Sequence, residues 1–270
     1  MYLADCHAHS NCSPDGAAPM ARMVQGAVEA GLQELTITDH CDLISMQGTI
    51  TLEFNWAPLR EQFAEALPLA EQAGLKLNYG IEIGGVATFQ KNADEILQEK
   101  LDFVLASVHN LSVEEGCGDF YEMNFRDRPD LCSYCLDDYF NSMEATVAWG
   151  NFDSLAHVPY LLRYMRDRDG MPVTMKTYED RIRAIFRELV RKDKALELNT
   201  CRGRSVEDYR DLLTWFREEG GELVTLGSDA HRPEDLGKGI AEGQELLREL
   251  GFHHYCIYHQ RSPEFVPLDM

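Results

Sequence analysis

Short apolar segments that favour β-structure alternate along the chain with longer segments whose apolar residues recur at a helical period. The predicted strands are Tyr2–Cys6, Glu34–Thr38, Leu75–Ile81, Phe103–Ser107, Ser154–Ala156, Ala195–Asn199 and Leu223–Gly227. The predicted helices are Pro19–Ala30, Pro58–Ala73, Ala93–Lys100, Leu136–Trp149, Tyr178–Lys192, Ser205–Glu219 and Gly237–Leu250. This alternation is typical of parallel strands joined by crossover helices, so we predict an α/β fold. No linker or repeat interrupts the pattern, which predicts one domain over residues 1–270.

Two predicted connections, Cys41–Ala57 and Asn110–Cys135, are longer than the usual connection of about two to six residues. Long loops of this kind either shape a substrate site or are solvated insertions. Aromatic and cationic residues of the second loop either clamp a ligand or pack the loop down, and they are Phe120, Tyr121, Phe125, Arg126 and Arg128. We expect substrate specificity to reside in these two loops.

The composition adds a large excess of acidic residues, since 46 Asp and Glu against 25 Lys and Arg give a formal net charge of −21. That charge opposes binding to long nucleic acids and to anionic lipids. The chain has no apolar run near the roughly 20 residues that span a bilayer, and its start lacks the pattern of a signal peptide. We therefore expect a cytoplasmic protein that acts on a small substrate.

The eight cysteines are scattered over a domain long enough to fold without disulfides, so we expect reduced thiols. Cys132 and Cys135 form a CxxC pair, but a structural zinc site needs about four such ligands. No second pair follows, and we predict no zinc there.

Histidines and carboxylates cluster where the predicted strands end. Six of the nine histidines lie there, namely His7, His9, His40, His109, His157 and His231, together with Glu82 and Asp229. A single histidine is more often structural, but six at the same end of successive parallel strands indicate a metal site. Nitrogen and oxygen ligands without matched thiolates suit Zn²⁺, Mn²⁺ or Fe²⁺ and do not decide among them. His253, His254 and His259 fall outside this pattern, and we expect surface or packing roles for them.

In their order along nearly the whole chain, the motifs HAHS, TDH, GIEI, SVH, LAH and GSDAH resemble those of the PHP family, the polymerase and histidinol phosphatase metallohydrolases. The segments ALELNTCRGR and GSDAHRPEDLG, with a final short strand, are similar to the histidinol-phosphate phosphatase branch. The resemblance implies a distorted seven-stranded (βα) barrel of TIM-like type with mostly parallel strands and up to three divalent metal ions.

The resemblance also implies three ligand sets, of which the first is His7, His9, Glu82 and Asp229. The second shares Glu82 as a bridge and adds His109 and His157, and the third is Asp15, His40 and His231. An ordinary Asp-Gly turn would by itself also explain Asp15. Asp5 and Asp39 lie beside ligand histidines and are candidates to accept a hydrogen bond from an imidazole, although Asp39 has the alternative of capping a loop.

A phosphate monoester carries about two negative charges, which metals and arginines can offset. Arg163 follows His157 by six residues, and Arg202 and Arg204 follow the sixth predicted strand. The branch tends to have an NTSGLR-like run where this chain reads NTCRGR, so either of the last two arginines can take the role. Cys201 has no base partner nearby in the sequence, and we expect a buried thiol there.

The expected activity is that of a metal-dependent phosphomonoesterase, with in-line attack on phosphorus by a metal-bound water or hydroxide. The branch resemblance implies L-histidinol phosphate as substrate, in histidine biosynthesis. Two alternatives stay open: a phosphoesterase for another small ester or nucleotide, and a non-catalytic metal-binding module. The sequence leaves the oligomeric state undetermined.

Overall fold

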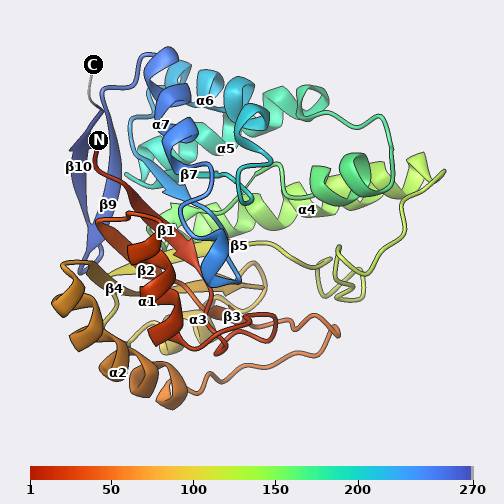
Figure 1. Ribbon diagram of the computed structural model, residues 1–270. Helices are drawn as coiled ribbons and strands as arrows, with labels where there is room; N and C mark the ends of the chain where they lie inside the picture. The colour runs from red at the N-terminus through yellow and green to blue at the C-terminus, as the bar shows by residue number, and fades with distance from the viewer. Residues whose placement is uncertain (269–270) are drawn as a thin grey trace.

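Seven parallel strands form a nearly closed barrel in the computed structural model, which describes residues 1–268 (Figure 1). They are β1 (Ala4–Ala8), β2 (Glu34–Ile37), β4 (Lys76–Gly84), β5 (Phe103–Ser107), β6 (Ser154–Leu155), β7 (Ala195–Asn199) and β8 (Val224–Gly227), and each pairs with the next in this order. The segment after β8 returns to β1, because Ala8 forms a parallel bridge with Ala230 and the His9 amide donates to its carbonyl at 2.8 Å. The expected seven-stranded, mostly parallel barrel is confirmed.

Helices follow most of the strands and cover the outside of the barrel (Figure 1). They are α1 (Met20–Glu29), α2 (Ala57–Ala73), α3 (Gln90–Ile96), α4 (Pro129–Trp149), α5 (Glu179–Arg191), α6 (Tyr209–Glu218) and α7 (Ile240–Glu249). Shorter helical turns lie at Arg163–Arg168, Met175–Tyr178, Val206–Asp208 and Pro233–Asp235. Each helix turns an apolar stripe toward the strands, as in α5, which buries Ile182, Ile185, Phe186 and Leu189 at helical spacing.

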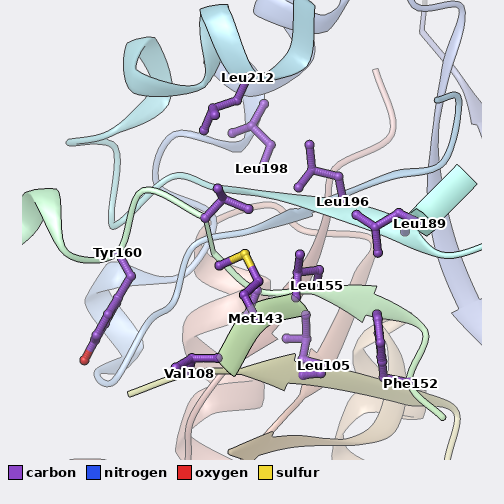
Figure 2. Packing of buried hydrophobic residues seen from close by; sticks show 14 of the residues in the cluster. Leu105, Val108, Met143, Phe152, Leu155, Tyr160, Leu189, Leu196, Leu198 and Leu212 are labelled. Carbon is purple, nitrogen blue, oxygen red and sulfur yellow. The ribbon is translucent and has the colours of Figure 1, made fainter. Parts of the chain in front are cut away.

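The main core lies between the strands and these helices. Figure 2 shows Leu105 of β5, Leu155 of β6 and Leu196 of β7 close to Met143 of α4 and Leu189 of α5. All five side chains are buried. Because strands and helices share this core, the barrel holds its strand ends in fixed relative positions.

Several element boundaries differ from the sequence-based prediction. The helix predicted from Leu136 begins at Pro129, a residue suited to the first helical turn, so the long loop before it is shorter than expected. An unpredicted strand, β3 (His40–Asp42), pairs with β4, and β4 itself extends to Gly84. His40 therefore begins a short strand instead of ending the second one, and this pairing sets it directly opposite Glu82.

The chain ends in an antiparallel hairpin of β9 (His254–His259) and β10 (Ser262–Pro267). His259 bonds Glu34 at 2.9 Å, and His254 packs its ring against Phe265. These contacts agree with the structural roles expected for the late histidines.

Within residues 1–268, no helix combines the length and the apolar character that crossing a membrane would require.

Candidate metal centre and substrate cavity

The nine predicted metal ligands converge at the carboxyl end of the barrel strands. His7 belongs to β1 and Glu82 to β4, while His109, His157 and Asp229 lie in the residues that follow β5, β6 and β8. Parallel barrels build their sites at this end because all strands run toward it. The fold therefore brings together residues that are far apart in the sequence.

The first predicted ligand set is compact and fully buried. His7 Nε2 lies 3.0 Å from His9 Nε2 and 3.3 Å from Glu82 Oε2. Asp229 Oδ1 is 3.7 Å from His7 Nε2 and 3.6 Å from His9 Nε2. The ligand atoms of His7, His9 and Glu82 lie within 4.8 Å of one another, and Asp229 faces both imidazoles.

The second set lies on the other oxygen of Glu82. Glu82 Oε1 is 2.8 Å from His157 Nε2 and 3.2 Å from His109 Nε2. Its Oε2 faces His7, and also His40 Nδ1 at 3.1 Å. Because its two oxygens face different imidazole groups, Glu82 has the geometry of a bridging carboxylate.

The third set is also assembled, and it includes Asp15. Asp15 Oδ2 lies 2.9 Å from His231 Nε2, and its Oδ1 lies 3.8 Å from His40 Nε2. His9, His40 and His231 have ligand atoms within 4.8 Å of one another. The loop that carries Asp15 therefore places this carboxylate beside His231 and His40.

The donor chemistry fits divalent cations. Imidazole nitrogens and carboxylate oxygens at these separations are ligands for zinc, manganese or iron. Burial lowers the pKa of His9 well below its usual value, and the imidazoles of His231 and His40 lower it further, so His9 has the neutral form that ligation requires. Burial opposes a charge on Glu82, but the imidazoles around it outweigh that effect and hold its pKa well below its usual range.

Glu197, a carboxylate that was not among the residues predicted from the sequence, contacts a ligand imidazole. Its Oε1 lies 2.6 Å from His7 Nδ1, and Asn199 Nδ2 donates to both Glu197 oxygens. Glu197 alternates with apolar residues in β7 and points into the barrel, so its charge within an apolar strand was an available signal. Gly227 makes room for the pair, because a Cβ there would lie 2.4 Å from that of His7 and 2.6 Å from Glu197 Oε1.

The carboxylate of Asp5 binds backbone amides instead of the ligand imidazole that was expected. Its carboxylate accepts hydrogen bonds from the backbone amides of Ser228 at 2.8 Å, Gly237 at 2.9 Å and His7 at 3.3 Å. These three backbone amides, and not an imidazole, hold the Asp5 carboxylate in place.

Asp39 caps the loop that follows β1, which was the alternative role considered for it. It accepts from the amide and hydroxyl of Ser10 and from the hydroxyl of Ser13, each at 2.7 Å. Ser13 Oγ lies 3.2 Å from His9 Nδ1 and accepts the His40 amide at 2.9 Å. Asp39 therefore positions His9 and His40 indirectly, through Ser13.

A further acidic residue, Asp42, lies among the ligands. Its Oδ1 is 3.1 Å from His109 Nδ1, and its Oδ2 is 3.4 Å from His40 Nδ1. A Cβ on Gly84 would approach Asp42 Oδ1 to 2.1 Å, so the neighbouring strand needs glycine there. Its spacing of two residues from His40 repeats that of His7 and His9, which was a usable signal.

Seven of the nine predicted ligands, all except His7 and His9, border a cavity of about 580 Å³. Arg163 lines it and is held by Asp229 Oδ2 at 2.8 Å and Asn199 Oδ1 at 2.7 Å. Arg202 also lines it, as does Arg232, which the sequence reading missed although it follows His231. Arg204 is not part of the cavity wall, because its guanidinium bonds the carbonyl of Cys201 at 3.1 Å in its own loop. The Cys201 thiol is buried, as expected.

The two long loops contribute unequally to the wall. Phe120 and Phe125 are fully buried and pack their loop down, whereas Tyr121 lines the cavity. Arg126 and Arg128 are exposed and lie outside the cavity wall. The first loop adds a larger group, Ser45, Met46, Gln47, Thr51, Glu53 and Phe54.

Comparison with known proteins relates this arrangement to characterised enzymes. A histidinol-phosphatase of Lactococcus lactis is 29% identical over 96% of this chain and 95% of its own length. A probable histidinol-phosphatase of Thermotoga maritima is 26% identical over 94% of this chain and 95% of its own. The DNA polymerase/3′-5′ exonuclease PolX of Bacillus subtilis is 29% identical over 89% of this chain, but over 37% of its own length.

A solved structure has the same fold. Histidinol phosphate phosphatase from Lactococcus lactis, complexed with zinc, L-histidinol and phosphate, superposes with a TM-score of 0.79 at 27% identity, covering 97% of this chain and 98% of that one. Residues 5–201 of this chain match the PHP domain family. With that match over most of its length, the chain belongs to the PHP domain family.

Proposed function

We propose that this protein is a metal-dependent phosphomonoesterase that hydrolyses L-histidinol phosphate to L-histidinol and phosphate. The observation that carries the proposal is the convergence of nine predicted ligand side chains, Glu82 among them, at one end of the barrel beside a cavity that arginines also line. Relatives named for this activity, aligned over nearly the whole chain, support it.

The ligand geometry supports up to three divalent ions. His7, His9, Glu82 and Asp229 would hold one of them. His109 and His157 would hold a second together with Glu82, and Asp15, His40 and His231 would hold the third. When bound, such ions polarise a water molecule and offset the charge of a phosphate ester.

The arginines would orient the phosphate. Arg163 is fixed on two sides by Asp229 and Asn199, so its guanidinium loses little freedom when an anion binds. Among residues 1–268, the buried Nε of Arg202 has no hydrogen-bond partner, so it can donate to a phosphate oxygen. We assign the phosphate contacts to these two residues and not to Arg204.

A second candidate is a phosphoesterase acting on nucleotides, which the similarity to PolX favours. The net charge of −21 disfavours long nucleic acids as substrates. We further propose a cytoplasmic location, since all eight cysteines are free thiols and such thiols persist in a reducing compartment. We also propose that residues 1–270 act as a single domain.

The test is a substrate panel assayed with protein loaded with Zn²⁺ or Mn²⁺. We expect phosphate release from L-histidinol phosphate with a kcat/KM well above that for sugar phosphates, nucleotides and p-nitrophenyl phosphate. His7→Ala should remove activity and bound metal together, whereas His253→Ala, in a histidine outside the centre, should change neither. Equal kcat/KM values across the panel would reject the assigned substrate, and an active metal-free protein would reject the mechanism.

A further inference from the structure

A row of tyrosines leads from the ligand histidines along the cavity wall. The ring of Tyr160 lies 4.9 Å from that of His157, and the ring of Tyr164 lies 5.1 Å from that of Tyr160. Tyr121, which is 52% exposed, continues the row at 5.7 Å from Tyr164. In Figure 2 the hydroxyl of Tyr160 points away from the labelled aliphatic core. All three tyrosines line the same cavity as the metal ligands.

A carboxylate that the metal centre does not use accompanies this row. Asp119 lines the cavity, is 6% exposed, and accepts a hydrogen bond from the Tyr121 amide on Oδ1 at 2.7 Å. Its own backbone is fixed, because the next amide, that of Phe120, donates to the carbonyl of His109 at 3.1 Å. The position of the carboxylate beside the metal centre is therefore set by the loop.

Within residues 1–268, no side-chain cation lies at ion-pair distance from Asp119. Four other acidic residues of the cavity wall each face an imidazole, namely Asp15, Asp42, Glu82 and Asp229. Burial raises the pKa of Asp119, and the Tyr121 amide and the His109 imidazole, which act in the opposite direction, offset this effect only in part. A cationic ligand would supply that compensation.

Resting on the proposed phosphatase function, we propose that Asp119 and the tyrosines Tyr121, Tyr160 and Tyr164 form a subsite that binds a cationic nitrogen of the leaving alcohol. The phosphate end of the substrate lies at the metal ligands and Arg163, and the tyrosine row extends from there toward solvent. An alcohol leaving group attached to that phosphate follows this row, and its nitrogen meets the carboxylate.

Attraction in this subsite comes from the carboxylate more than from the ring faces. The guanidinium of Arg163 lies 5.3 Å from the centre of the Tyr160 ring, and that of Arg168 lies 5.2 Å from the centre of the Tyr164 ring. These arginines already occupy cation–π positions, so the rings serve as apolar walls. The walls exclude water and thereby strengthen the interaction of a ligand cation with Asp119.

The test compares phosphate esters that differ in their nitrogen groups. L-histidinol phosphate carries both an ammonium and an imidazole, L-phenylalaninol phosphate keeps only the ammonium, and 3-(imidazol-4-yl)propyl phosphate keeps only the imidazole. For wild-type protein, we expect the loss of the recognised nitrogen group to lower kcat/KM about tenfold to hundredfold. Because each of the two analogues lacks a different nitrogen group, the analogue with the lower kcat/KM shows which group is bound.

The variant Asp119→Asn retains the oxygen that accepts the Tyr121 amide but removes the charge. We expect it to lower kcat/KM for L-histidinol phosphate, relative to kcat/KM for p-nitrophenyl phosphate, by about tenfold or more. Glu122→Gln makes the same change of charge at an exposed position of the same loop, outside the cavity, and should leave the ratio unchanged. Metal content and circular dichroism confirm that each variant is folded.

The outcomes separate this proposal from the proposed function. Absence of hydrolysis of every ester by wild-type protein would reject the phosphatase function itself. Hydrolysis of L-histidinol phosphate and its two analogues at similar kcat/KM, or an equal loss on both substrates in Asp119→Asn, would reject the cation subsite while leaving the phosphatase function intact.

Discussion

At the scale of single residues, the centre depends on carboxylates that fix imidazoles in one tautomer. Glu197 Oε1 lies 2.6 Å from His7 Nδ1, so a neutral His7 with its proton on Nδ1 would donate to Glu197 and present the lone pair of Nε2 to a metal ion. Asp42 has the same relation to His109. A carboxylate that binds the other nitrogen of a ligand imidazole orients the ring and raises the basicity of the nitrogen that would bind metal.

We predict that Glu197→Gln weakens metal binding by about tenfold to hundredfold, because the neutral amide supports the His7 tautomer less strongly. Competition with a chelator for Zn²⁺ or Co²⁺ measures the affinity, and the Co²⁺ absorption spectrum reports the ligand geometry. Glu222→Gln, an exposed residue near β8, is the matched control and should bind like wild type. Equal affinities for the two variants would show that Glu197 only fills space.

At the scale of elements, the seam between β1 and β8 closes the barrel. Few backbone bonds cross it, among them those from Asp229 to His7 at 2.9 Å and from His9 to Ala230 at 2.8 Å. Asp5 reinforces the seam by accepting the amides of Ser228 and Gly237. The seam thus joins two strands whose ends carry His7, His9 and Asp229.

We predict that Asp5→Ala lowers the free energy of unfolding by about 3 kcal/mol, since it leaves buried backbone amides without acceptors. Urea unfolding of the metal-free protein measures the effect without a contribution from bound ions. Asp211→Ala, which removes a half-exposed carboxylate paired with Lys176, should change the free energy by less than about 0.5 kcal/mol. A similar loss in both variants would refute the role of Asp5 at the seam.

At the scale of the whole molecule, an acidic protein builds an anion site through its bound ions. The chain carries a formal charge of −21, yet three divalent ions would add about six positive charges at the barrel end. Much of that end consists of ligand side chains from strands distant in sequence, so the ions would also link those strands.

We predict that removal of metal with a chelator lowers the melting temperature and abolishes phosphatase activity, and that added Zn²⁺ or Mn²⁺ restores both. Each ion at about a thousand times its dissociation constant contributes about 4 kcal/mol to the free energy of unfolding, provided that it does not bind the unfolded chain. Thermal unfolding followed by circular dichroism, with and without metal, checks this. An unchanged melting temperature would contradict a metal centre that joins the strands.

The sequence by itself determined the parallel α/β architecture and the common location of eight predicted ligands, whereas Asp15, in a loop, was predicted only from the resemblance to the PHP family. Strand periodicity shows which residues end each strand, and parallel strands bring those ends together whatever the details of packing. Helix and loop boundaries were less determined, as the early start of α4 at Pro129 and the additional strand β3 demonstrate.

Only the tertiary structure decided which of the chemically suitable residues meet. It paired Glu197 with His7 across 190 positions, assigned Asp5 to backbone amides, and placed Arg202 but not Arg204 in the cavity wall. It also placed Asp119 in the cavity wall beside the tyrosine row. The physical reason is that periodicity specifies the face on which a side chain lies, whereas the distance between side chains of remote strands depends on barrel closure and loop conformation.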